Sequence, residues 1–294
     1  MKVNPLIYID KPVTAFSLTD GYSLEVSARA VPVLAANAAG IPRGSMVSVP
    51  WLPGESNDAR LAAIRAIREL GFQPMPHLAA RRIASRVELE AFIQRAVAEG
   101  GIERCFVIAG DPATPKGPFA DSYSLIETGV FERAGIKVVG VGGHPDGHSI
   151  MSEADRWDVL ERKCQAIVSR GMAPLIITQF AFDADLVLAW LGALRERGIA
   201  HPVRVGVPGP AGLAVLARYA ALCGVSACAS MWASYGLSLG RLLGTAGPDH
   251  FVDRLVAGLT AAHGDVQLHF FPFGGVAQSV EWIGRYRARA GTAP

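Results

Sequence analysis

Polar residues with catalytic potential stand at or near the ends of short apolar runs in this sequence. They are Glu25 in SLEVS, His77 in MPHL, Asp111 in AGDP, His144 and His148 in HPDGH, and Gln179 in ITQF. Carboxylates and imidazoles serve as general acids and bases, and an amide can orient a bound molecule. If the apolar runs are parallel strands, their carboxyl ends meet on one face and bring these side chains together.

Glu25 and Asp111 are the candidates for catalysis. Apolar residues flank Glu25, and burial there would raise its carboxyl pKa, which suits a general acid near neutral pH. The alternative is an inward glutamate paired with an arginine. Asp111 follows Gly110, which permits close backbone approach, so its carboxylate would orient or tune a cofactor. Its alternative role is a turn residue, because Asp before Pro commonly starts turns.

Other motifs are less specific. Arg162 and Lys163 in LERKC would neutralise a pyrophosphate, although a solvated helix face explains two basic residues as simply. We expect the segment 113–123, ATPKGPFADSY, to be a mobile loop that covers a ligand. The histidines and Asp111 lack the short spacing typical of metal sites, and we predict no metal. No GxGxxG follows the first strand, and GxxxxGK[ST] and GxSxG do not occur.

Eight short runs, often rich in Val, Ile or Phe, alternate with helical patterns, which predicts parallel βα units. The candidate strands cover residues 22–28, 45–51, 73–78, 104–110, 137–143, 173–180, 203–209 and 266–273. Eight is the strand number of a closed (β/α)8 barrel, so we predict an α/β TIM barrel whose single catalytic domain spans 1–294. A doubly wound open sheet fits less closely and is the alternative fold.

The intervening segments show helical apolar faces. Leu89, Phe92, Ile93, Ala96 and Val97 recur at helical spacing, as do Trp157, Leu160, Cys164 and Ile167. We expect further helices over 58–70, with Asp58 as N-cap, and over 183–198, with Gly198 as the left-handed C-cap. Residues 29–40 predict only a weak helix, and 233–263 hold enough residues for extra helices before the last strand.

Composition excludes several classes of protein. Hydrophobic residues make up 50% and charged residues 18%, without an apolar run long enough for a membrane span. The N-terminal residues lack a signal-peptide pattern, so we expect a soluble cytoplasmic protein. A net charge of +2 without a basic cluster favours small-molecule partners over nucleic acid or membrane. We expect the scattered cysteines Cys105, Cys164, Cys223 and Cys228 to be buried thiols.

These motifs, in this order, resemble the methylenetetrahydrofolate reductase family from about Ser23 to Trp282. The segment 177–183, ITQFAFD, resembles the family's TQFFFD, and 144–148, HPDGH, resembles its YPEGH or YPEVH turn. Three shorter matches are AGDP at 109–112 with RGDPP, PHLA at 76–79 with PHLTC, and VPGP at 207–210 with PGI. The agreement in order and spacing makes the resemblance specific.

The resemblance implies a flavin-dependent oxidoreductase that interconverts 5,10-methylenetetrahydrofolate and 5-methyltetrahydrofolate, with hydride passing through FAD and NAD(P)H. It implies that Glu25 protonates the folate during ring opening and that Asp111 lies by the flavin and pterin. The residues it places around FAD are His77, Gly110, Asp111, Phe119, Ala120, His144, His148, Arg162 and Lys163. The residues it assigns to substrate binding are Asp111, Gln179 and Tyr219.

The chain departs from the family pattern at several positions. Pro50 replaces a threonine in SVTYG, Ala109 the arginine of RGDPP, and His144 the tyrosine of YPE. Val215 is the nearest match to an expected glutamine, and FFPFGGVAQS lacks the arginine of the family's LNR segment. The missing glutamine and arginine prompt one alternative function, a noncatalytic pterin-binding relative. A metal-assisted lyase or hydrolase on a TIM barrel is the other alternative.

Self-association is a further expectation. The apolar outer helices carry the tryptophans Trp190, Trp232 and Trp282, and large apolar side chains on outer surfaces commonly mark contacts between subunits. We therefore expect a homo-oligomer.

Overall fold

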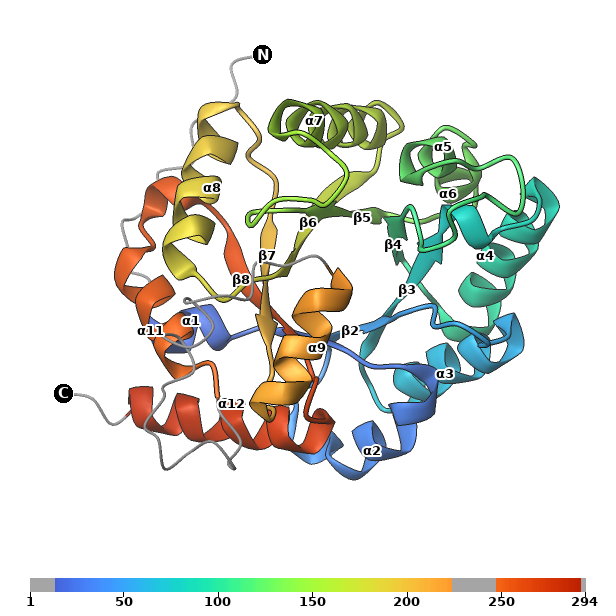
Figure 1. Cartoon of the computed structure of the whole chain (residues 1–294). Helices are drawn as coiled ribbons and strands as arrows, with labels where there is room; N and C mark the ends of the chain where they lie inside the picture. The colour runs from blue at the N-terminus through green and yellow to red at the C-terminus, as the bar shows by residue number, and fades with distance from the viewer. Residues whose placement is uncertain (1–13, 224–246, 292–294) are drawn as a thin grey trace, which may run out of the picture.

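The computed structural model describes residues 14–223 and 247–291, in which eight parallel strands close into a barrel surrounded by helices (Figure 1). The strands are β1 (Ser23–Glu25), β2 (Met46–Val49), β3 (Gln73–Ala79), β4 (Arg104–Ile108), β5 (Val138–Gly143), β6 (Ala173–Phe180), β7 (Val203–Pro208) and β8 (Val266–Phe271). Each strand pairs with its sequence neighbour, and β1 pairs with β8. The predicted (β/α)8 barrel is confirmed, and the open sheet is wrong because the sheet has no edge.

Helices connect the strands around the outside of the barrel (Figure 1). The α-helices are α1 (Ala15–Thr19), α2 (Val31–Ala36), α3 (Asn57–Glu69), α4 (Arg86–Gly100), α5 (Ser122–Ile126), α6 (Val130–Arg133), α7 (Glu153–Ser169), α8 (Ala184–Glu196), α9 (Leu213–Cys223), α11 (Asp249–Gly258) and α12 (Val276–Gly291). The 3₁₀-helices are η1 (Ala28–Ala30), η2 (Ala38–Gly40), η3 (Ala80–Arg82) and η5 (Ala261–His263). Helices α11 and η5 precede β8, as expected, whereas residues 233–246 of that region lie outside the described residues.

The helix boundaries correct two sequence predictions. The N-cap of α3 is Ser56, whose side chain accepts a hydrogen bond from the Ala59 amide, and not Asp58. Asp58 lies in the first turn, and its carboxylate accepts a hydrogen bond of 2.8 Å from Arg95. Helix α8 has Arg197 and not Gly198 as its C-cap, but Gly198 follows directly and has the expected left-handed conformation, with a φ of 76°.

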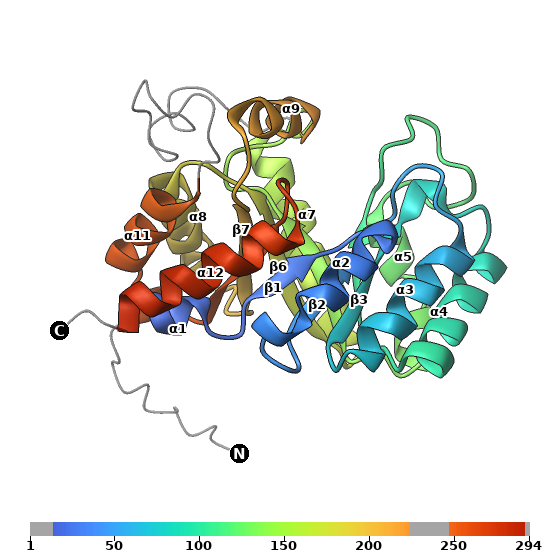
Figure 2. The ribbon, with the colours of Figure 1, turned by 90° about the horizontal axis from the view of Figure 1, so that it is seen from below.

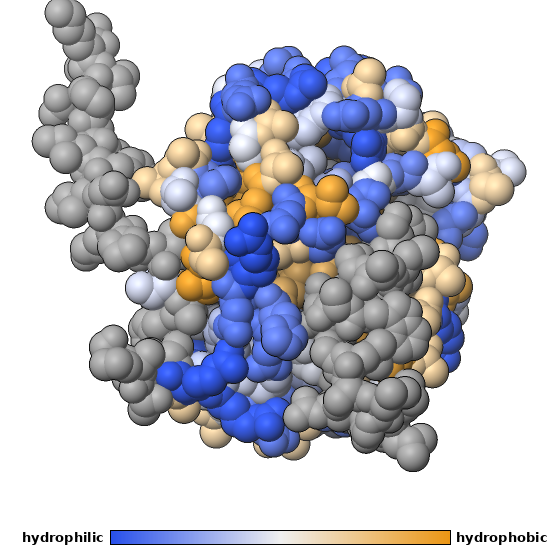
Figure 3. All heavy atoms as spheres, turned by 60° about the vertical axis from the view of Figure 1, so that its left-hand side comes forward, coloured by the Kyte–Doolittle hydropathy of each residue, from blue (hydrophilic) through white to orange (hydrophobic). Residues whose placement is uncertain are grey.

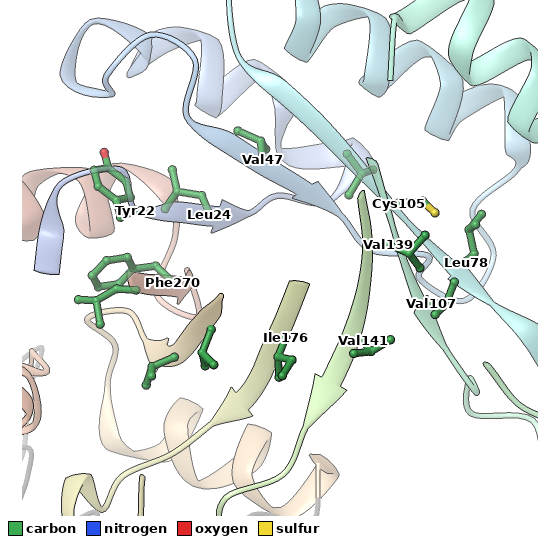
Figure 4. Packing of buried hydrophobic residues seen from close by; sticks show 14 of the residues in the cluster. Tyr22, Leu24, Val47, Leu78, Cys105, Val107, Val139, Val141, Ile176 and Phe270 are labelled. Atoms are coloured by element: carbon green, nitrogen blue, oxygen red, sulfur yellow. The ribbon is translucent and has the colours of Figure 1, made fainter. Parts of the chain in front are cut away.

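The main hydrophobic core lies between the barrel and the helices. Figure 4 shows Leu24, Val47, Leu78, Val107 and Ile176 projecting from five strands into this layer. The alternate positions face the inside of the barrel, where a second cluster packs. Its buried members are Met46, Met75, Phe106, Leu175 and Ile177. Because both faces of each strand are covered, the strands read as nearly continuous apolar runs.

Of the four cysteines, Cys105 and Cys164 are buried free thiols, as predicted, and burial raises the pKa of Cys164 to about 11. The side chain of Cys223 and the whole of Cys228 lie outside the described part of the chain.

Two segments project from the barrel at the carboxyl ends of its strands. Figure 2 shows α9 and the loop between β4 and α5 projecting from this same end. The face that carries α8 and α11 mixes polar areas with smaller apolar patches (Figure 3). None of the helices within 14–223 and 247–291 is both long and apolar enough to cross a membrane.

Candidate active site

Glu25 and His77 form the buried centre of the site. Glu25 ends β1, its side chain is 23% exposed, and its Oε2 lies 3.5 Å from Nε2 of His77 in β3. Burial raises the pKa of Glu25 to about 7. Burial, followed by the positive charge of Arg60, lowers the pKa of His77 to about 3. The contact therefore joins a carboxyl group that keeps its proton at mildly acidic pH and loses it around pH 7 to an imidazole that is neutral over the same range.

Two buried polar atoms beside Glu25 lack hydrogen-bond partners among the described residues. They are Nε2 of His77 and Oγ of Ser48, which lies opposite Glu25 in the β1–β2 register. Buried donors and acceptors are normally satisfied, so their presence here marks a place for a polar ligand or water. The alternative of a glutamate paired with a barrel arginine is wrong, because the described partner of Glu25 is His77.

A second histidine lies inside the barrel and was not among the predicted site residues. His269 in β8 is buried, and its Nδ1 lies 2.8 Å from Oγ of Ser23. Arg204 of β7 donates to the Gly21 carbonyl at 2.8 Å and to Ser23 Oγ at 3.4 Å. This group fixes β1 just before Glu25. The alternation of Leu268 and Phe270 toward the core was the sequence signal that His269 points inward.

Arg60 in α3 supports His77 from outside the barrel. It is fully buried, and its Cζ lies 4.4 Å from the ring centroid of Trp51 and 4.5 Å from that of Phe92. Its Nη2 donates to the His77 carbonyl, and its Nη1 donates to Asn57 Oδ1 at 3.2 Å. Sequence reasoning did not single out Arg60, although it shares a helical face with the buried Ile64 and Ile67.

Asp111 lies on the rim of the barrel. Its side chain is 80% exposed, and its Oδ2 accepts a hydrogen bond of 2.6 Å from Arg82 of η3. Arg82 also donates to the Trp51 carbonyl at 2.9 Å. The preceding Gly110 has a φ of 90°, and an added Cβ would lie 3.0 Å from the Cβ of Ala79. A glycine is therefore required for this turn, both for its positive φ and for its close packing against the end of β3.

The loop after β4 is anchored to η3, principally through Arg81. The Arg81 amide donates to the Ala109 carbonyl, and the Lys116 amide donates to the Arg81 carbonyl, both at 2.9 Å. The Arg81 side chain donates from Nε to the Ala120 carbonyl at 2.7 Å. Phe119 is buried in the main core, which leaves only its main chain for a ligand. The loop that we expected to be mobile is thus held at several points along its length.

The β5–α7 region brings the other predicted nucleotide-binding residues together. The rings of His144 and His148 pack edge to face, 4.8 Å apart. Burial lowers the pKa of His144 to about 4, and burial also lowers the pKa values of His148 and Lys163. Lys163 forms no hydrogen bond or ion pair with other described residues. Arg162 is exposed and stacks on Tyr123, with its Cζ 4.6 Å from the ring centroid.

The predicted substrate residues Gln179 and Tyr219 lie near an aromatic group at the ends of β6 and β8. Tyr219 of α9 stacks on Phe273 with ring centroids 4.1 Å apart. Phe180 packs edge to face on Phe273 at 4.9 Å. The side chain of Gln179 accepts a hydrogen bond from the Phe180 amide at 3.1 Å. These contacts join α9 to the rim of the barrel beside Gln179.

A cavity of about 340 Å³ lies outside the barrel, between α7 and α8. Trp157 and Trp190 line it, and their rings stack on each other with centroids 5.7 Å apart. Residues 142–145, at the end of β5 and just after it, also line this cavity. Among the described residues, no cluster of three or more His, Cys, Asp or Glu side chains is arranged to hold a metal ion.

The closed parallel barrel makes this chain a (β/α)8-barrel protein. Its ionisable and amide side chains gather at the carboxyl ends of the strands, which is where the active sites of such barrels lie. The sequence matches the family model "Methylenetetrahydrofolate reductase" over residues 34–236, more than half of the chain. The chain belongs to the methylenetetrahydrofolate reductase family, a family of folate-related enzymes. The match extends from α2 into residues beyond α9 and begins after Glu25.

One of the similar solved structures shares the barrel fold. Dihydropteroate synthase from Thermus thermophilus is 16% identical, with a TM-score of 0.51, over 91% of this chain and 93% of that chain. The 3-dehydroquinate dehydratase from Aquifex aeolicus is 9% identical, with a TM-score of 0.47, over 91% and 97% of the two chains. At 16% identity, the similarity to dihydropteroate synthase shows a shared barrel fold and does not show a shared function.

Proposed function

We propose that this chain is a flavin-dependent oxidoreductase that interconverts 5,10-methylenetetrahydrofolate and 5-methyltetrahydrofolate. The observation that carries the proposal is Glu25, a carboxyl group in the barrel mouth whose pKa burial raises to about 7. An acid with a pKa near the working pH is effective in proton transfer. Membership of the methylenetetrahydrofolate reductase family supports the folate as substrate.

The chain's own residues have distinct roles in this proposal. Glu25 gives its proton to the folate nitrogen that leaves during ring opening and takes it back in the reverse direction. The neutral His77 beside Glu25 adds no positive charge that would promote loss of this proton. Asp111 and the amide of Gln179 orient the pterin from the rim. Tyr219 and Phe273 provide an aromatic surface on which a flat ring of the substrate stacks.

The residues along the β3–β5 edge fit an FAD molecule. Nε2 of His77 is buried and lies 3.5 Å from Glu25, but it forms no hydrogen bond within the described residues. Lys163 is a half-buried cation without a hydrogen bond or ion pair among the described residues. An unpaired ammonium suits a phosphate, and the glycine turn at Gly110 lets a ring approach the backbone. His144 and His148 would lie along the same nucleotide. FAD supplies the group that carries hydride between the nicotinamide and the folate.

We also propose that NAD(P)H is the second substrate, which exchanges hydride with the flavin. We propose further that the protein works in the cytoplasm and that it forms a homo-oligomer. Exposed Leu186 on α8 and exposed Val168 on α7 are apolar surface that would be covered in such an oligomer. Size-exclusion chromatography with light scattering tests the oligomer, and a monomeric mass at all concentrations would remove it from the proposal.

The test of the proposed function is an absorption spectrum of the purified protein, followed by anaerobic addition of 5-methyltetrahydrofolate. We expect flavin bands, identified as FAD after release, that bleach when the folate is added. Glu25→Gln is expected to bind FAD but to bleach far more slowly, whereas Glu281→Gln on the exposed face of α12 should behave as the wild type. A colourless protein that cannot be reconstituted with FAD would reject the flavin chemistry and leave only the fold in common.

A further inference from the structure

Arg60 is an unusual arginine for its surroundings. It is fully buried between α3, α4 and β3, yet it forms no salt bridge with any described residue. Removing a guanidinium from water is energetically costly, and a carboxylate partner normally compensates that cost. Here two aromatic faces, Trp51 and Phe92, and two neutral acceptors replace the carboxylate. An apolar residue would pack there at lower cost, so Arg60 calls for a role other than packing.

The contacts of Arg60 connect the two candidate catalytic carboxyl groups. On the inner side, Arg60 donates to the main chain of His77, whose ring lies 3.5 Å from Glu25. On the outer side, Arg60 stacks on Trp51.

The connection continues from Trp51 to the rim. The Trp51 carbonyl accepts from Arg82, and Arg82 also binds Asp111 at 2.6 Å. The chain of contacts therefore runs without a gap from Glu25 to Asp111. Trp51 directly follows Pro50, one of the positions where the sequence departs from the family pattern.

We propose that Arg60 is a positioning residue of the site, which holds His77 against Glu25 and couples Glu25 to the Asp111–Arg82 pair through Trp51. The role of Glu25 as the acid rests on the proposed function, whereas the positioning of Glu25 by Arg60 can be measured without FAD or folate. The charged groups that face Arg60 are Glu55, Arg82 and Glu88, and none of them reaches the guanidinium as a salt-bridge partner in the described structure.

The experiment is a carboxyl ¹³C NMR titration of Glu25 in the ligand-free full chain, with the signal identified by its absence in Glu25→Gln. In Arg60→Met, His77 loses its anchor, water reaches the carboxyl group, and we expect the Glu25 pKa to fall by about one unit toward 4.5. Arg60→Lys keeps an N–H donor that can reach the His77 carbonyl but loses the planar fork, so the fall in the Glu25 pKa should be smaller. Arg65→Met, on the exposed side of α3, is the matched control and should leave the titration unchanged.

The outcomes separate positioning from packing. A lower Glu25 pKa in Arg60→Met, with partial recovery in Arg60→Lys, supports the proposal. A Glu25 pKa equal to that of the wild type in both variants, with only a lower melting temperature, would show that Arg60 serves packing alone. If Arg60→Met does not fold, Arg60→Lys decides in the same way. Because no flavin is needed, a protein that fails the FAD test still gives an answer here.

Discussion

Nε2 of His77 lies 3.5 Å from Oε2 of Glu25, and burial moves the pKa values of these two groups in opposite directions. The carboxyl pKa rises to about 7 and the imidazole pKa falls to about 3. Between these two values, both side chains are predominantly neutral, so the contact is not an ion pair. The fold thus keeps a proton on Glu25 at pH values where an exposed glutamate has lost it, which is the state that a general acid needs.

Glu25→Gln will change how the free energy of unfolding depends on pH. The folded pKa of Glu25 lies above its ordinary 4.5, so the folded state retains a proton that the unfolded state releases. Relative to the variant, wild-type stability therefore falls as pH rises from about 4.5 to about 7, by up to about 3 kcal/mol. Urea unfolding at about pH 5 and about pH 8 measures this difference. An equal difference at both pH values would contradict the raised pKa.

Asp111→Asn will separate ligand binding from stability. The Asp111–Arg82 pair lies on the rim with the carboxylate 80% exposed, and such surface pairs contribute about 0–1 kcal/mol. We therefore expect little change in the melting temperature but a weaker complex with FAD or folate, measured by fluorescence titration. Asp58→Asn, which affects another exposed arginine pair, is the control and should change neither property much. Unchanged affinities in Asp111→Asn would remove Asp111 from the site.

Much of the barrel could be predicted because local patterns determine it. Leu24, Val47 and their equivalents face the helices, whereas Met46 and Met75 face the inside, so the strands read as apolar runs separated by helical periodicity. The raised pKa of Glu25 followed from its apolar flanks for the same reason. These properties depend on neighbours within a few residues along the chain, and a sequence displays such neighbours directly.

The supports of the site could not be predicted, because they depend on long-range contacts. Arg60 reaches the carbonyl of a residue in the next strand, and Arg82 reaches Asp111 across the gap between two βα units. Arg81 and Arg82 are adjacent in η3, yet Arg81 donates to the Ala120 carbonyl and Arg82 donates to the Trp51 carbonyl. The sequence does not show which of these two arginines holds the 113–123 segment. Arg60 was not singled out from the sequence, although it shares a helical face with the buried Ile64 and Ile67, and helical spacing does not show which acceptor a buried side chain meets.

Arg81→Met will loosen the loop after β4 without unfolding the barrel. The substitution removes the side-chain hydrogen bonds to the Ala120 and Pro112 carbonyls, while the main-chain bonds of residue 81 to Ala109 and Lys116 remain. We expect faster amide hydrogen exchange in 113–121 and unchanged exchange in the barrel strands. Arg86→Met, which removes an exposed side chain from α4, is the control. Equal exchange of the loop in wild type and Arg81→Met would show that its main-chain bonds alone hold it.

Lys163→Met will distinguish a phosphate contact from a ring contact. Lys163 is half-buried and forms no hydrogen bond or ion pair with the described residues, so a phosphate of FAD would be its partner. We expect the variant to bind FAD about ten-fold more weakly, equivalent to about 1.4 kcal/mol, and to bind riboflavin, which has no phosphate, as the wild type does. Fluorescence titrations with both ligands measure the two affinities, and Lys137→Met, whose lysine pairs with Glu103, is the control. An equal loss of affinity for FAD and for riboflavin would mean that Lys163 lies beside the flavin ring or that the substitution disturbs the whole site. Unchanged affinity for both ligands would exclude a phosphate contact.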